Sequence, residues 1–142
     1  MLEKVQIVIL VRDESKINVL LLKTNEKRGG FWQNITGAVE QNDFSTWSAA
    51  RREVLEETGI ELAEENLINL EESFEYFDHN RNTSYIEKIY LGVIEELPTI
   101  NLSPEHQSYE LKPSNEIKED IYKFKSNYKA FLESMTYLRE RG

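Results

Sequence analysis

Residues 45–59 constrain the fold most, because they predict one short amphipathic helix with both of its ends marked. Ser45 is a residue type that caps helix N-termini, and Gly59 is a residue type that follows the last helical residue. At about 100° per residue, one side of this helix is apolar. We expect a helix from about Ser45 to Thr58 that buries this side and leaves its glutamates off it. The apolar side consists of Trp47, Ala50, Val54 and Leu55.

Strand-forming segments surround this helix. Strands are predicted at Val5–Arg12, Ile17–Lys23, Phe31–Val39, Leu67–Phe77 and Ile86–Glu95, with a short one at His106–Leu111. Apolar residues at steps of three and four from Ile117 to Leu138 predict a C-terminal amphipathic helix, which Ser126 splits by capping a second piece. This order of elements predicts an α/β or α+β fold with a mixed sheet. The length of 142 residues fits one domain, 1–142.

The charge of the chain limits its partners. A protein that holds nucleic acid by its phosphates needs a basic surface, so the net charge of −9 argues against a nucleic acid partner. The longest apolar run, Ile7–Val11, is too short to cross a membrane. We find no secretory signal and no cysteine, which fits a cytoplasmic protein. A phosphate ligand would need local Lys and Arg, backbone N–H groups or a bridging cation, and the oligomeric state is left open.

Three glutamates crowd the end of the predicted helix, where carboxylates are electrostatically disfavoured. Glu53 and Glu57 are four residues apart and Glu56 is three from Glu53, so the side chains lie on one stripe and repel by a few tenths of a kcal/mol per pair. Mg²⁺ prefers carboxylate and water oxygens and commonly bridges to substrate phosphates. The cluster is therefore either a magnesium site for phosphoryl chemistry or a solvated acidic helix end, partly neutralised by Arg52.

The surrounding residues decide in favour of the metal site. Residues 37–60 read GAVEQNDFSTWSAARREVLEETGI, which resembles the signature of the Nudix hydrolases. Gly37 matches the first glycine, and residues 52–60 match the second half without exception. Between the two, this chain has one residue more than the usual spacing. The acid of the loop is therefore either Asp43, displaced by one, or replaced by Phe44, and we expect a one-residue bulge before Ser45.

The resemblance implies an α/β/α sandwich with a mixed sheet and a C-terminal helix. It also implies an Mg²⁺- or Mn²⁺-dependent pyrophosphohydrolase, in which water attacks a phosphorus of a small-molecule phosphoanhydride substrate. Glu53, Glu56 and Glu57 would be the metal ligands, with Gly37 in the same site and Glu56 and Glu57 also catalytic. Arg52 would orient a glutamate rather than touch the substrate.

Further segments resemble one group of the family, the bacterial dihydroneopterin triphosphate pyrophosphatases. FWQNITGAVE at 31–40 and KSNYKAF at 125–131 are similar to segments of that group, and SPEHQSY at 103–109 resembles its Glu-His-x-x-Tyr segment. The resemblance makes Glu105 a fourth carboxylate, as metal ligand or general base. The candidate substrate-binding residues are Phe31, Trp32, Thr36, Ser126 and Lys23, the last together with Lys27 and Arg28.

Structural alternatives to these roles remain open. Phe31 and Trp32 have the types of core or strand-edge residues, and His106 and His79 have types that suit structural or exposed positions. The segment between Phe74 and Ile86 is shorter than the loop that the pterin group uses near its substrate. A dinucleoside polyphosphate or (d)NTP pyrophosphohydrolase is therefore the alternative, and the acidity disfavours RNA 5′-pyrophosphohydrolysis. The alternative of a different class is a non-catalytic, nucleotide-sensing Nudix-like domain.

Overall fold

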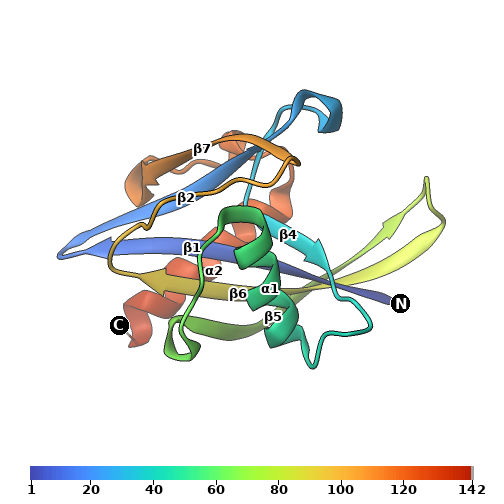
Figure 1. Ribbon diagram of the computed structural model, residues 1–142, viewed down its shortest axis with the longest axis horizontal. Helices are drawn as coiled ribbons and strands as arrows, with labels where there is room; N and C mark the ends of the chain where they lie inside the picture. The colour runs from blue at the N-terminus through green and yellow to red at the C-terminus, as the bar shows by residue number, and fades with distance from the viewer. Residues whose placement is uncertain (142) are drawn as a thin grey trace.

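The computed structural model describes residues 1–141. Within them, a mixed sheet has helix α1 on one face and helix α2 on the other (Figure 1), as the sequence predicts. The strands are β1 (Leu2–Asp13), β2 (Lys16–Thr24), β3 (Trp32–Gln33), β4 (Ile35–Ala38), β5 (Leu67–Asp78), β6 (Thr83–Ile94) and β7 (His106–Pro113). The helices are α1 (Thr46–Thr58) and α2 (Lys125–Arg141).

Strand β1 changes partners along its length. It pairs in parallel with β6, while on its other side residues 4–7 pair antiparallel with β4 and residues 10–13 pair antiparallel with β2. The far end of β2 pairs with β3, and its outer edge pairs with β7. Strands β1 and β2 therefore diverge, and β3 and β4 fill the gap between them. This arrangement places residues 32–38 beside α1.

Alternate residues of β1 supply two hydrophobic cores, because successive side chains of a strand point to opposite faces. Val5, Ile7 and Ile9 belong to the core that includes residues of α1. Val8 and Leu10 belong to the core that includes residues of α2. Burial on both faces explains the near-continuous apolar run of this strand.

Helix α1 begins and ends where the sequence predicts. The Ser45 side chain accepts a hydrogen bond from the Ser48 N–H at 3.1 Å. Gly59 adopts the left-handed conformation, with φ 80°, and its N–H donates to the Leu55 carbonyl at 2.8 Å. The next segment closes the helix further, because the N–H groups of Asn101 and Ser103 donate to the last carbonyls, those of Thr58 and Glu57.

The predictions for individual side chains of α1 were partly wrong. Leu55 was assigned to the buried side and is 49% exposed, whereas Glu53 and Glu57 are 8% and 5% exposed. The buried stripe is rotated toward the glutamates because β4 and residues 101–106 cover that part of the helix. Trp47 is half-buried, and Ala50 and Val54 are buried, as predicted.

Two predicted elements also differ from the structure. The predicted strand at residues 31–39 is divided at Asn34 into β3 and β4, because each half pairs with a different neighbour. The C-terminal helix begins only at Lys125, so Ser126 lies in its first turn and does not cap it. Residues 114–124 form two short 3-10 turns instead, and their apolar side chains follow the sheet, with Tyr122 forming a β-bridge to Trp32.

No helix in residues 1–141 is long and apolar enough to cross a bilayer.

Candidate active site

The Glu53 side chain reaches from α1 to the place that a side chain at position 37 of β4 would occupy. A methyl group on Gly37 would overlap the carboxyl group of Glu53. The Glu53 side chain therefore lies directly against the β4 backbone, and the two halves of the signature meet in space as they do in the sequence. Because Gly37 has no side chain, it leaves room for the Glu53 carboxylate, and it does not serve here as a turn residue.

Glu53 is unusual because it is a buried acid, only 8% exposed, that lies beside other acids. Burial raises the pKa of its carboxyl group to about 7, and the contact with Arg52 only partly offsets this effect. The Arg52 Nη1 atom lies 2.9 Å from Glu53 Oε1. A bound cation would remove the cost of this buried charge, which is the behaviour expected of a metal ligand.

The raised pKa of Glu53 predicts how stability depends on pH in buffer free of divalent cations. The carboxyl group titrates near 4.5 when unfolded and near 7 when folded, so the folded state binds more protons between these values. The unfolding free energy that this difference in the pKa of Glu53 contributes is fully present below pH 4.5 and is lost as the pH rises through about 7. We expect Glu53→Gln, which cannot ionise, to lose less unfolding free energy than the wild-type protein over this interval in urea denaturation. Equal losses in both proteins would contradict the prediction.

Arg52 joins the loop before α1 to the glutamates. Its Nε and Nη2 atoms donate to the two oxygens of Asp43, each at 2.8 Å, and Nη2 also donates to the Ala38 carbonyl at 3.0 Å. Its Nη1 atom donates to Glu53 and, at 3.1 and 3.2 Å, to both oxygens of Glu56. The guanidinium group holds the pKa of Asp43 below its usual range, and the surrounding acids raise the pKa of Arg52.

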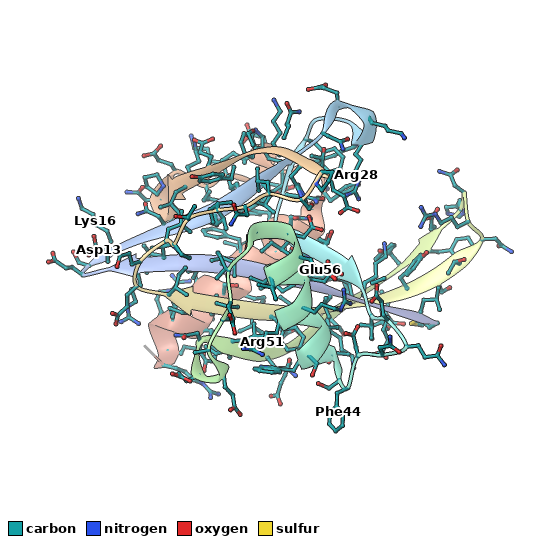
Figure 2. The ribbon with its side chains drawn as sticks, viewed as in Figure 1. Asp13, Lys16, Arg28, Phe44, Arg51 and Glu56 are labelled. Carbon is teal, nitrogen blue, oxygen red and sulfur yellow. The ribbon has the colours of Figure 1, made fainter. Side chains whose placement is uncertain are left out.

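These contacts assign the acidic position of the loop. Asp43 makes the paired contact with Arg52, and it also accepts from the Glu40 N–H at 2.7 Å. Phe44 is 98% exposed and points away from the molecule (Figure 2). Asp43 therefore supports the helix in spite of the extra residue, and the additional length is taken up in the exposed turn of residues 40–44.

Glu57 is held from the side opposite to Arg52. The Ser103 hydroxyl donates to Glu57 Oε2 at 2.8 Å, and Nδ1 of His106 lies 2.7 Å from the same oxygen. Burial alone would raise the pKa of Glu57, but these two contacts and the nearby Glu105 lower it below its ordinary value. Glu57 therefore stays ionised while the buried neighbour Glu53 takes up a proton more easily.

Glu105 lies at the edge of this group. Its side chain is 54% exposed, and Oε2 lies 3.0 Å from Nη1 of Arg28. The backbone around it is tied to the loop after β2, since the Asn25 N–H donates to the Glu105 carbonyl at 2.9 Å. The structure thus brings Glu105 to Glu57 and places a cation, Arg28, beside it.

The predicted substrate-binding residues lie on two edges of the β3–β4 segment. Lys23 and Trp32 are opposite each other in the β2–β3 pair, and Trp32 packs partly against the core on the α2 side. Phe31 meets Phe124 edge to face with ring centres 5.4 Å apart, and Nζ of Lys123 lies 4.6 Å from the centre of the Phe31 ring. These aromatic and cationic side chains adjoin the segment that carries Gly37, and within residues 1–141 no hydrogen bond or ion pair joins them to the α1 glutamates.

Thr36 and Ser126 lie near a buried polar cluster that sequence reasoning missed. Thr36 is opposite Gln6 in the β1–β4 pair, and Ser126 precedes Asn127 in α2. Gln6 Nε2 donates to Glu87 Oε1 at 2.7 Å, and Asn34 Nδ2 donates to Gln6 Oε1 at 2.8 Å. The Asn34 N–H donates to Asn127 Oδ1 at 2.7 Å. Burial raises the pKa of Glu87. Buried amide and acid side chains in the middle of strands are the signal that could have indicated it.

The glutamates of α1 have the chemistry of a divalent-cation site but are not preassembled as one. No group of three His, Asp or Glu side chains within residues 1–141 is arranged to hold a metal ion. Glu53 and Glu56 are instead turned toward Arg52, and Glu57 toward Ser103. The donor set fits Mg²⁺ or Mn²⁺, because it consists of carboxylate oxygens beside a backbone that glycine leaves open.

The comparison with known families identifies the class of this domain. The family model described as NUDIX domain matches residues 2–134. The chain belongs to the Nudix family. It is an enzyme of the pyrophosphohydrolase class, as the sequence predicted. Among curated proteins, no sequence matches the chain significantly.

Solved structures share the fold across nearly the whole chain. A C. elegans Ap4A hydrolase in a binary complex is 22% identical, with a TM-score of 0.79 and 99% of each chain covered. The Nudix domain of Shewanella oneidensis NrtR, complexed with ADP ribose, is 13% identical, with a TM-score of 0.79, covering 97% of this chain and 88% of that one. The E. coli dihydroneopterin triphosphate pyrophosphohydrolase is 28% identical, with a TM-score of 0.73 and 91% of each chain covered.

Proposed function

We propose that this Nudix enzyme uses Mg²⁺ or Mn²⁺ to cleave a diphosphate linkage in a nucleoside-triphosphate-like substrate. The observation that carries the proposal is the grouping of Glu53, Glu56 and Glu57 at the end of α1, against the opening at Gly37. These three glutamates would hold the cation, with Glu105 as a fourth carboxylate. A bound cation would neutralise phosphate charge and lower the pKa of the attacking water. It would also allow a chain with a net charge of −9 to bind an anion.

The other residues of the site have supporting roles in this proposal. Arg52 holds Glu53 and Glu56 and, being enclosed by acids, is positioned to orient them and not to bind substrate. Glu105 has the most exposed side chain of the four carboxylates of the site and is the group best placed to accept a proton from water. Arg28 is exposed beside it and can turn toward a phosphate oxygen.

Dihydroneopterin triphosphate is the first candidate substrate. The 28% identity over 91% of each chain to the E. coli dihydroneopterin triphosphate pyrophosphohydrolase supports it. Phe31, Trp32 and Thr36 would contact the ring system, with Ser126 at the start of α2 and Lys23 near the phosphates. A dinucleoside polyphosphate or (d)NTP is the second candidate, and the short turn of residues 79–82 between β5 and β6 favours it.

Replacing Glu105 with alanine tests its role in proton transfer. We expect the maximal rate to fall by about 10²-fold, the size of a lost general base, with a smaller change in KM. Glu110→Ala is the matched control, because Glu110 is an exposed acid in β7, the strand that follows Glu105. Steady-state kinetics on both variants give the comparison. An unchanged rate in Glu105→Ala would remove this residue from the mechanism.

A substrate panel with identified products tests the proposed function. The panel contains dihydroneopterin triphosphate, the common nucleoside and deoxynucleoside triphosphates, and dinucleoside polyphosphates, each with Mg²⁺ and with a chelator. We expect Mg²⁺-dependent release of pyrophosphate and a monophosphate from a triphosphate substrate. Products of internal cleavage of a dinucleoside polyphosphate would favour the second candidate. Tight, metal-independent binding without any turnover would contradict both.

A further inference from the structure

One oxygen of Glu57 receives two contacts from residues far away in the sequence. The Ser103 hydroxyl donates to Oε2 at 2.8 Å, and Nδ1 of His106 lies 2.7 Å from the same atom. The side chains of His106 and Glu57 are only 2% and 7% exposed, so water does not substitute for either partner. Because both contacts converge on Oε2, they fix the position of this oxygen and leave the other oxygen, Oε1, outside these two contacts.

The hydrogen-bond partners of His106 define which ring nitrogen carries the hydrogen. The Gln33 Nε2 atom lies 3.1 Å from the ring Nε2 atom, and an amide nitrogen can only donate. With the Gln33 amide in this orientation, the ring Nε2 accepts and Nδ1 carries the hydrogen that faces Glu57. This Nδ1 atom is buried and lies 2.7 Å from Glu57 Oε2, and the angle of its N–H is not that of a formed hydrogen bond within residues 1–141.

These contacts form a continuous line from β3 to α1. Gln33 is 5% exposed and lies in β3 between Trp32 and Asn34. His106 is the first residue of β7, and Glu57 is in the last turn of α1. Three elements that are distant in the sequence are thus connected through buried side chains at the point where the glutamates end.

We propose that Gln33, His106 and Ser103 form a brace that positions Glu57 for cation binding. The proposal rests on the proposed function, in which Glu57 is a metal ligand. His106 acts in it through the contact of Nδ1 with Glu57 and touches neither substrate nor cation. The brace differs from Arg52, which contacts Glu53 and Glu56.

Calorimetric titration of Mn²⁺ into the full chain tests the brace without measuring turnover. His106→Leu removes the donor at nearly constant volume, and we expect it to weaken Mn²⁺ binding by about 10- to 100-fold, as the loss of such supporting contacts does in known metal sites. His106→Asn places an amide N–H near the position of Nδ1 and should recover most of the affinity. His79→Leu is the matched control, since His79 is exposed in the β5–β6 turn, and it should bind Mn²⁺ as the wild-type protein does.

A double-mutant cycle distinguishes a contact through Glu57 from a general effect on folding. In the Glu57→Gln background, His106→Leu should produce little further loss of Mn²⁺ affinity, because the residue through which it acts is already changed. An equal loss in both backgrounds, unchanged affinity in His106→Leu, or no recovery in His106→Asn would overturn the brace. Thermal unfolding of each variant reports whether the fold persists.

The failure of the brace and the failure of the proposed function give different results. If the wild-type protein binds Mn²⁺ and His106→Leu binds it equally well, the brace is wrong and the metal site stands. If the wild-type protein and Glu57→Gln both fail to bind Mn²⁺, the metal site is wrong and the brace falls with it. Ring ¹⁵N chemical shifts of His106 that place the hydrogen on Nε2 would also overturn the brace, whatever the metal does.

Discussion

Replacing Glu57 with glutamine is expected to reduce the turnover number by about 10²-fold or more while the fold is retained. The amide has the shape of the carboxylate, and its oxygen can still accept from Ser103 and lie beside Nδ1 of His106, so the local packing persists. The substitution removes the negative charge that would bind a cation. Electrostatic stabilisation by a catalytic cation contributes several kcal/mol, and each 1.36 kcal/mol is a factor of ten in rate.

The control for this variant is an acid that lies outside the site. Glu65→Gln changes the same functional group in an exposed 3-10 turn, and we expect it to have wild-type activity. Activity and thermal unfolding should be measured on both variants at saturating Mg²⁺. If Glu57→Gln retains full activity under these conditions, the assignment of the metal site is wrong.

Replacing Gly37 with alanine is expected to affect stability and activity together. The added methyl group would overlap the Glu53 carboxyl group, so either β4 or the glutamate must move. Forcing an additional methyl group into such a closely packed place costs about 1–3 kcal/mol of unfolding free energy. Displacement of Glu53 should also weaken Mn²⁺ binding, which the same calorimetric titration measures.

A second substitution separates the steric effect from other effects at this position. Glu53→Ala removes the side chain that the methyl group would meet. The Gly37→Ala substitution should therefore cost much less unfolding free energy in the Glu53→Ala background than in the wild-type protein. The same cost in both backgrounds would place the clash elsewhere and contradict the close approach of β4 and α1.

Local features of the sequence were sufficient to predict the architecture and the position of the glutamates. The ends of α1 follow from Ser45 and Gly59, whose capping behaviour depends on neighbouring residues only. The stripe of Glu53, Glu56 and Glu57 follows from the helical repeat. The alternation of strand and helix segments predicted a mixed sheet, which the structure confirms, whereas the helix on each face was implied by the family resemblance.

The features that could not be predicted depend on contacts between distant residues. Glu53 is buried because of Gly37, and Asp43 is selected over Phe44 because it reaches Arg52. The contact of His106 with Glu57 joins residues far apart in the chain, and no local pattern indicates it. The roles of Glu105 and of the substrate-binding residues came from family resemblance and remain predictions.

The C-terminal region illustrates the same limit. The helical repeat from Ile117 to Leu138 predicted a helix split at Ser126, but the first part of the segment follows the sheet as two 3-10 turns. Ile117 and Tyr122 are buried there in the core on the α2 side. A periodic pattern reports which residues are apolar at regular steps, and tertiary contacts decide which of them become helical.

The most direct test of the account is the dependence of hydrolysis on a divalent cation. The rate on the best substrate of the panel should be measured for the wild-type protein with a chelator and then with increasing Mg²⁺, and the same titration should be repeated for Glu57→Gln. We predict no turnover in the chelator, saturable activation by Mg²⁺ in the wild-type protein, and no comparable activation in the variant. Hydrolysis that proceeds equally with the chelator, or equal activation of both proteins, would contradict the assignment of the α1 glutamates as the metal-binding catalytic site.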